Sequence, residues 1–221
     1  MPDLALFTLL HLLVFVYWLG GDLGAFYTSR FLIRPGVSAD RRLMAAKIVG
    51  DVDMAPRTAL ILALPTGLSL AAAKGWLAMG PAVMAALWAG SLAWLALAWA
   101  IHNRHGAAPM AWRQADLMIR WLMIAGLVAA AAWSLSGAGG GDGLPLFLSL
   151  KLLALAGCTG LGLYIRAVLA PLGPALMGLT GPDAAGAEAS LAATLNRARP
   201  LVVCIWALLI AAAALALFKP I

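Results

Sequence analysis

The first apolar segment of the chain runs from Leu4 to Gly21 and reads LALFTLLHLLVFVYWLGG, with no acidic or basic residue other than one histidine. A helix needs about 20 mostly apolar residues to cross the hydrocarbon core of a bilayer. The segment therefore has the length and composition of a transmembrane helix. It follows Asp3 rather than a basic segment, and it continues into Asp22 and further apolar residues without a small-residue cleavage site. These flanks argue against a cleaved signal peptide.

The composition of the whole chain extends this prediction to the rest of the protein. Of its 221 residues, 64% are hydrophobic and 11% are charged, whereas a soluble domain is about half apolar and a quarter charged. A soluble enzyme and a disordered chain are both excluded. Two cysteines are too few for a disulfide scaffold or a four-thiolate zinc site. The net charge of +6 is scattered between apolar segments, so no nucleic-acid surface is expected. The first predicted partner is the lipid bilayer.

Apolar segments between the charged residues predict an all-α integral membrane bundle of six transmembrane helices. We expect one polytopic domain over residues 1–221, with helices at about 4–33, 43–73, 81–102, 115–137, 144–169 and 197–218. The longest connection, 170–195, is rich in Pro, Gly and Ala and fits either a surface amphipathic segment or a flexible loop.

The positions of lysine and arginine predict the orientation of the bundle, because these residues are enriched in cytoplasmic loops. With the N-terminus outside, the outer side receives only Lys74, Lys151 and Lys219. The inner loops receive Arg30, Arg34, Arg41, Arg42, Lys47, Arg104, Arg113, Arg120, Arg166, Arg197 and Arg199. Both termini should then face the outside of a multi-pass protein of the bacterial inner membrane.

Two ionisable residues, His11 and Lys151, are expected at membrane depth near the outer face. Each lies seven residues after the start of its apolar segment, about 10 Å into the membrane at 1.5 Å per residue. Phe7, Phe15 and Trp18 share a helical face with His11, as they would if they lined a flat haem that the imidazole ligates. Ordinary packing, with Lys151 extending to the outer interface, explains the same spacing and is favoured on spacing alone.

A second group, near the inner face, comprises Asp22, Asp51, Asp53 and Arg57. Asp53 and Arg57 stand four residues apart, with the acid first, which is the favourable order on a helix. An unpaired charge at this depth is more costly than a paired one, so we expect a structural ion pair between the first two helices. A proton path or ion site is the alternative.

Other candidate ligands give weaker signals. The chain has three histidines, one fewer than two bis-histidine haems require. His102 and His105, spaced i,i+3, supply too few ligands for a metal site by themselves. The nine methionines are dispersed, and Cys158 and Cys204 lie in different spans, so a thioether or thiolate copper cluster is not indicated.

The pattern His11-(six residues)-Trp18-x-x-Gly21, followed by Phe26-Tyr27 and Arg30, resembles the opening helix of the HemJ-type protoporphyrinogen oxidases. These small bacterial membrane proteins are related to the CopD copper-resistance domain. Further similar segments are Leu150-Lys151-Leu152-Leu153, the region from Arg41-Arg42-Leu43 to Pro65-Thr66-Gly67-Leu68, and the closing Lys219-Pro220.

This resemblance covers the first, second, fifth and sixth predicted helices. It implies a haem b bound by His11, with Phe15 and Trp18 beside it, Lys151 as the important lysine, and oxidation of a porphyrinogen to a porphyrin. The chain departs from the family in its greater length, in a lysine on the fifth helix rather than the third, and in additional residues between Gly21 and Phe26.

Three functions follow as expectations. The first is a haem-b redox protein in which Lys151 neutralises a carboxylate and electrons leave toward a quinone or respiratory partner. The second is a CopD-like copper transport or metal-handling protein, and the third is a non-catalytic membrane accessory subunit. A homo-oligomer is compatible with all three. Neither the substrate nor a second haem ligand follows from the sequence.

Overall fold

A computed structural model describes residues 2–104, 106–137 and 143–219, which form helices and their connections without any strand. Six helical segments are long and apolar enough to cross a membrane. The prediction of an all-α, six-span membrane bundle is confirmed. The elements are α1 (Pro2–Thr28), the 3₁₀ turn η1 (Ser29–Leu32), α2 (Ala39–Val52), α3 (Met54–Ala73), α4 (Pro81–Asn103), α5 (Met110–Leu135), α6 (Leu146–Val168), α7 (Leu172–Gly178) and α8 (Ala184–Phe218).

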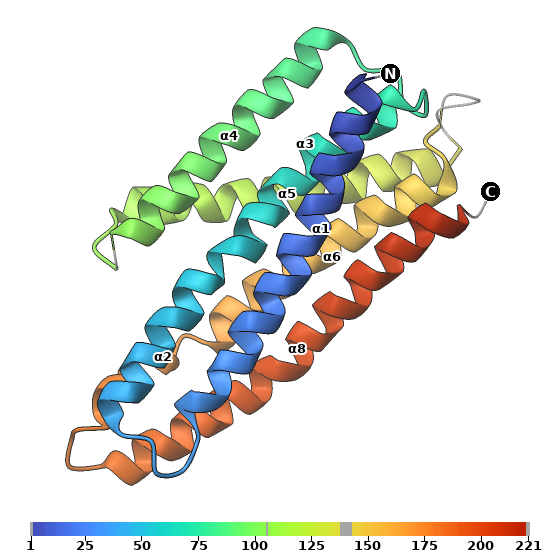
Figure 1. The fold of residues 1–221 in the computed structure, drawn as a ribbon. Coiled ribbons are helices and arrows are strands. Elements are labelled where there is room, and N and C mark those ends of the chain that lie inside the picture. Colours follow the sequence, from blue (N-terminus) through green and yellow to red (C-terminus); the bar gives the residue numbers. More distant parts are fainter. Residues whose placement is uncertain (1, 105, 138–142, 220–221) are drawn as a thin grey trace.

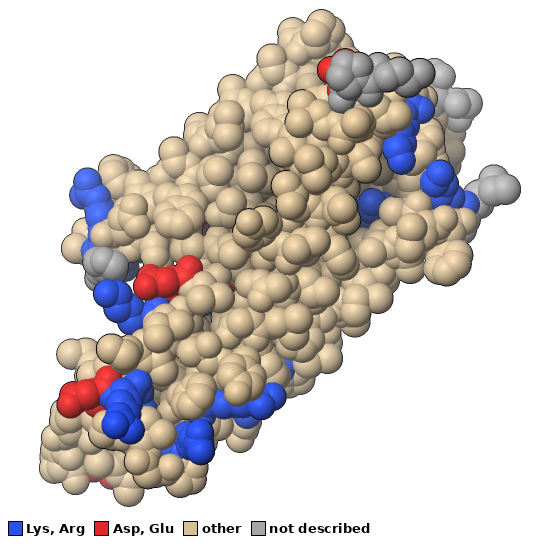
Figure 2. Space-filling model, in the orientation of Figure 1, with Lys and Arg blue, Asp and Glu red and all other residues tan. Residues whose placement is uncertain are grey.

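The six spans lie alongside one another, with α1 packed between α3 and α8 and with α6 joining α8 to α5. Both termini lie at the same end of the bundle (Figure 1), as an even number of crossings requires. Figure 2 shows that Lys, Arg, Asp and Glu gather toward the ends and leave a broad uncharged band between them. This band is the surface that a bilayer would cover.

Glycine and proline set the turns between spans. Gly75 and Gly137 follow the ends of α3 and α5 with φ of 72° and 69°, a left-handed conformation that glycine adopts without a Cβ penalty. Pro81 then begins α4 at its first turn, where the absent N–H leaves no hydrogen bond unmade.

The last helix differs most from its predicted bounds. We expected it over 197–218, after a connection at 170–195, but α8 begins at Ala184 and continues through Pro200, and α7 occupies part of the connection. The side chain of Asp183 caps α8 by accepting a hydrogen bond from Gly186 N at 3.0 Å. A proline inside a helix removes one backbone hydrogen bond, and α8 continues through Pro200 because it packs against α6 and α7.

Three of the six apolar segments, Ala39–Ala73, Leu146–Gly178 and Ala184–Phe218, have 33 to 35 residues and are longer than one crossing of the hydrocarbon core requires. The 23 residues of α4 span about 34 Å, close to the hydrocarbon thickness, whereas the 35 residues of α8 span about 52 Å. At the inner end of α4, His102 Nε2 lies 3.2 Å from Asp51 Oδ1. This contact lies near the α2–α3 junction, where we place the inner boundary of the hydrocarbon core. Helices α2 and α7 and the first turns of α8 lie beyond it, and we call this part of the bundle the extension.

The extension has a small hydrophobic core of its own. Leu32, Ala45, Leu176, Leu191 and Leu195 are buried there and join η1, α2, α7 and α8. Arg42, only 4% exposed, binds Glu188 at 2.8 Å and donates to the Val37 carbonyl at 3.0 Å. These contacts hold the inner ends of α1, α2 and α8 together.

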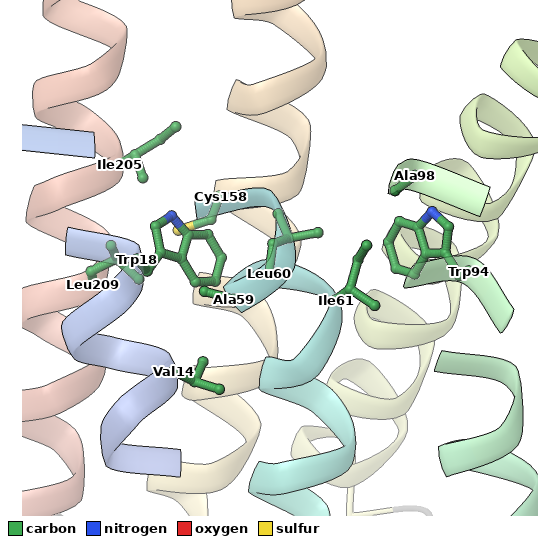
Figure 3. Close-up of a cluster of buried hydrophobic side chains, with 10 residues drawn as sticks. All are labelled: Val14, Trp18, Ala59, Leu60, Ile61, Trp94, Ala98, Cys158, Ile205 and Leu209. Atoms are coloured by element: carbon green, nitrogen blue, oxygen red, sulfur yellow. The ribbon is translucent and has the colours of Figure 1, made fainter. Parts of the chain in front are cut away.

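The main core lies in the membrane between α1, α3, α4, α6 and α8. Trp18 is 4% exposed and packs with Leu60, Cys158 and Leu209 from three other helices, as Figure 3 shows. In the same figure Trp94 of α4 faces Ile61 of α3. The largest side chains of the core therefore fill spaces between helices.

Gly21, which has no side chain, lets α1 and α3 approach each other closely. A Cβ atom placed on Gly21 would lie 2.6 Å from Pro56 Cδ and 2.9 Å from Ala55 Cβ, both shorter than van der Waals contact. The neighbouring Gly20 has no atom within 4 Å of the corresponding position. Small residues that permit such approaches are typical of membrane helix interfaces.

Gly21→Ala should lower the free energy of unfolding by about 1–3 kcal/mol, because the added methyl group overpacks the α1–α3 interface. Gly20→Ala is the matched control and should leave stability unchanged or slightly raised, since alanine favours helix. The unfolding midpoint of the detergent-solubilised protein measures both. Equal midpoints for the two variants would contradict the close packing at Gly21.

Candidate functional site

The imidazole of His11 on α1 lies against α3, where its Nδ1 is 3.0 Å from Thr66 Oγ1. The Thr66 hydroxyl itself donates to the Leu62 carbonyl at 2.6 Å. Because its proton is used there, the hydroxyl oxygen accepts a hydrogen bond from Nδ1–H. This arrangement assigns the neutral tautomer in which Nε2 carries the free lone pair.

A glycine on α3 shapes the space around the same ring. A Cβ on Gly67 would lie 3.0 Å from His11 Cε1 and 3.6 Å from Nδ1, closer than side chains normally pack. The Thr66-Gly67 pair therefore supplies both an acceptor and room for the imidazole. Thr66 is 2% exposed, which shields this hydrogen bond from water and lipid.

Lys151 of α6 lies near enough to His11 for the two groups to interact electrostatically, and Lys74 acts on Lys151 in turn. The ammonium groups of Lys74 and Lys219 lie 4.8 and 5.3 Å from the centre of the Trp76 ring. Among the described residues, none of the three lysines forms a salt bridge with a carboxylate. The outer end of the bundle thus brings together one imidazole and three lysine side chains.

The three aromatic residues that share a face of α1 with His11 differ in how deeply they are buried. Trp18 is buried in the main core, and Phe15 is partly buried against it. Phe7 is partly exposed near the outer end of α1. In this arrangement Trp18 is a packing residue whose ring is already covered by Leu60 and Cys158.

An apolar cavity of about 350 Å³ lies between α3, α5 and α6. Leu64 and Leu68 flank the Thr66-Gly67 pair along α3, and Leu152 follows Lys151. The remaining lining residues are Leu77, Met79, Met123, Gly126, Leu127, Ala130 and Leu144. His11 is not among the residues that line this cavity.

The four inner residues do not form one cluster. Arg57 Nη2 and Nε lie 2.5 and 2.7 Å from Asp53 Oδ2, so the ion pair joins two positions of the α2–α3 segment rather than the first two spans. Asp51 binds His102 of α4. Asp22 lies within electrostatic range of Asp53 but forms no salt bridge with a described residue, and its buried Oδ2 makes no hydrogen bond. The other histidine of the inner pair, His105, lies outside the described residues.

The strongest polar network was not predicted from the sequence. Asp116 of α5 is 4% exposed and accepts from Trp94 Nε1 of α4 at 2.9 Å and from Arg166 Nη1 of α6 at 3.0 Å. Arg120, 5% exposed, donates a hydrogen bond to each of the two carboxylate oxygens of Asp116, both at 3.1 Å. One carboxylate therefore connects three helices. The spacing of Asp116 and Arg120 matches that of Asp53 and Arg57 and was the available signal.

No three side chains of His, Cys, Asp or Glu converge on a potential metal position within the described ranges. Met84 Sδ lies 3.2 Å from Ser69 Oγ, which also accepts from Trp88 Nε1 at 3.0 Å. This methionine therefore takes part in an interhelical contact between α3 and α4.

Comparison with known proteins found no match to a family model, a curated protein or a solved structure.

Asp116→Asn should destabilise the protein by about 3–5 kcal/mol, because it leaves the buried guanidinium of Arg120 and that of Arg166 without a countercharge. Asp53→Asn is the control. Its ion pair with Arg57 is 32–43% exposed, and an exposed pair contributes about 0–1 kcal/mol. The unfolding midpoints of the two variants in detergent give the comparison of their stabilities. A loss from Asp53→Asn as large as that from Asp116→Asn would refute the central role of Asp116.

Proposed function

We propose that the protein is a multi-pass membrane redox protein that binds haem b through His11, in the bacterial inner membrane. The observation that carries the proposal is the hydrogen bond from His11 Nδ1–H to Thr66 Oγ1. Histidines that ligate metals commonly donate their other ring N–H to a neighbouring acceptor, which orients the ring and selects the tautomer. Nε2 would then be the atom that holds the haem iron.

The surrounding residues fit the other parts of a haem. Its propionates are carboxylates, and Lys151 lies beside His11 with Lys74 near it. A buried amine and a carboxylate each reduce the cost of desolvating the other. Gly67 adds no side chain beside the imidazole, and Phe7 and Phe15 lie along the same face of α1. Trp18, which is covered in the core, is assigned to packing.

The chain's own residues have separate tasks in this proposal. His11 holds the iron, Thr66 keeps the proton on Nδ1, and Lys151 binds a carboxylate of the cofactor or of a carboxylate-bearing substrate. Bound haem b supplies one-electron transfer. By the resemblance to HemJ-type proteins, the donor is a porphyrinogen, and the electrons pass to a quinone or another respiratory-chain acceptor.

The donor set favours haem over copper. A copper-handling site needs several soft or imidazole ligands at one place, and no three His, Cys, Asp or Glu side chains come together within the described ranges. A haem is held largely by apolar contacts and needs one or two protein ligands, so a single oriented imidazole suffices. A non-catalytic accessory role requires no haem, so a colourless wild-type protein would favour that role.

The purified wild-type protein should show a Soret absorption band, and His11→Ala should lose it because the axial ligand is removed. His102→Ala is the control: this histidine binds Asp51 at the inner end, so its variant should keep the band. Absorption spectra of equal amounts of folded protein make the comparison, with pyridine-haemochrome analysis identifying haem b. A colourless wild-type protein from haem-replete cells would defeat the proposal.

Thr66→Val should keep the shape of the side chain but remove the acceptor for Nδ1–H. Loss of such a hydrogen bond commonly lowers metal affinity about 10–100-fold, so we expect weaker retention of haem and a shifted Soret maximum. Thr159→Val is the control, since this buried threonine bonds only to Leu155 of its own helix. Titration of the apoprotein with haemin measures both affinities. Equal affinity for haemin in the two variants would show that Thr66 does not support haem binding by His11.

A further inference from the structure

A hollow of about 420 Å³ opens between the inner end of α1 and α8, far from His11. It is lined by Tyr27, Arg30, Phe31, Ile33, Arg34 and Arg199. Three of its six lining residues are arginines, and no aspartate or glutamate lines it. The proposed haem site at the outer end takes no part in this hollow.

Arginine and aromatic side chains alternate along this part of the chain. The Arg30 guanidinium lies 5.0 Å from the centre of the Tyr27 ring, and that of Arg34 lies 5.9 Å from the Phe31 ring. Tyr27 and Phe31 contact each other edge to face at 6.3 Å. The aromatic rings thus hold the two guanidinium groups beside the hollow while leaving their N–H donors free for an anion.

Arg199 adds a third donor from α8. Its guanidinium lies 5.8 Å from the Phe26 ring, and its buried Nε makes no hydrogen bond. A buried donor without a partner is costly in a folded protein. Among the described residues, no carboxylate forms a salt bridge with Arg30, Arg34 or Arg199, whereas the nearby Arg42 binds Glu188. The three arginines lack a countercharge from the chain.

The depth of the hollow matches the phosphate level of the inner leaflet. Tyr27 lies 23 residues after Leu4, where the apolar part of α1 begins, which is about 35 Å at 1.5 Å per residue. Arg199 lies 19 residues before Phe218, the last residue of α8, which is about 29 Å. The hydrocarbon core is about 30 Å thick and each headgroup region adds about 5–7 Å, so both residues lie at or next to the inner headgroup level. Tyr27, 59% exposed, is also a residue type enriched at the membrane interface.

We propose that this hollow binds the phosphate of an anionic phospholipid headgroup of the inner leaflet. Arg30, Arg34 and Arg199 donate hydrogen bonds to the phosphate oxygens, and Tyr27 and the exposed apolar surface of α1 contact the acyl chains. Basic pockets between transmembrane helices on the cytoplasmic side are suited to such headgroups. The lipid would join α1 to α8 at the level where the extension leaves the membrane.

Native mass spectrometry of the full-length protein in detergent tests this assignment, with phosphatidylglycerol and phosphatidylcholine as probes. Wild-type protein should retain phosphatidylglycerol in preference to phosphatidylcholine. Arg30→Gln and Arg199→Gln should each weaken phosphatidylglycerol binding about tenfold, the effect expected for one charge-assisted hydrogen bond. Arg30 is exposed, so its variant folds independently of any packing role of Arg199.

Arg197→Gln is the matched control, since this exposed arginine lies two residues from Arg199 and does not line the hollow. It should bind as the wild type does. Equal retention of the two lipids, or equal losses in Arg197→Gln and Arg30→Gln, would overturn the site. Displacement of the lipid by millimolar inorganic phosphate would overturn the lipid as occupant in favour of a free anion. None of these outcomes depends on the Soret band, so this proposal and the haem proposal fail separately.

Discussion

Hydrocarbon offers no hydrogen bonds, so each polar side chain in the membrane must find its partner within the protein. Asp116 meets this constraint most completely, because its two oxygens receive donors from Trp94, Arg120 and Arg166 on three helices. Helices α4 and α5 otherwise lie at the periphery of the bundle (Figure 1). Helix α5 packs on α6 through Leu127, Ala131, Leu152 and Ala156, and Asp116 adds the polar contacts that tie α4 and α5 to α6.

The same constraint explains the outer site. His11 Nδ1 forms a hydrogen bond with Thr66 Oγ1, and the Thr66 hydroxyl donates its own proton to the Leu62 carbonyl of α3. This contact requires α1 and α3 to pack closely, which Gly21 permits toward the inner side and Gly67 permits beside the imidazole. The orientation of a candidate ligand is thus a consequence of helix packing, and the glycines are as necessary to it as the threonine.

Apolar run length predicted the six spans because hydrocarbon thickness acts on each helix separately. Helical spacing likewise anticipated the Asp53–Arg57 pair, which is local in the chain, and the common depth of His11 and Lys151. It missed Thr66 because its partner His11 lies on another helix, and no single-sequence pattern reports which helices are neighbours. The spacing of Asp116 and Arg120 was visible in the sequence, but the contacts of Asp116 with Trp94 and Arg166 on other helices were not. The start of α8 was misplaced because its predicted bounds followed the last apolar segment, whereas tertiary contacts of Leu191 and Leu195 extend the helix before that segment.

The length of α8 has a mechanical consequence. One uninterrupted helix passes from the inner extension, where Leu191 and Leu195 anchor it, to Lys219 at the opposite end beside Trp76. Because the helix is continuous, a displacement of α8 at Leu191 and Leu195 would also move the end that carries Lys219.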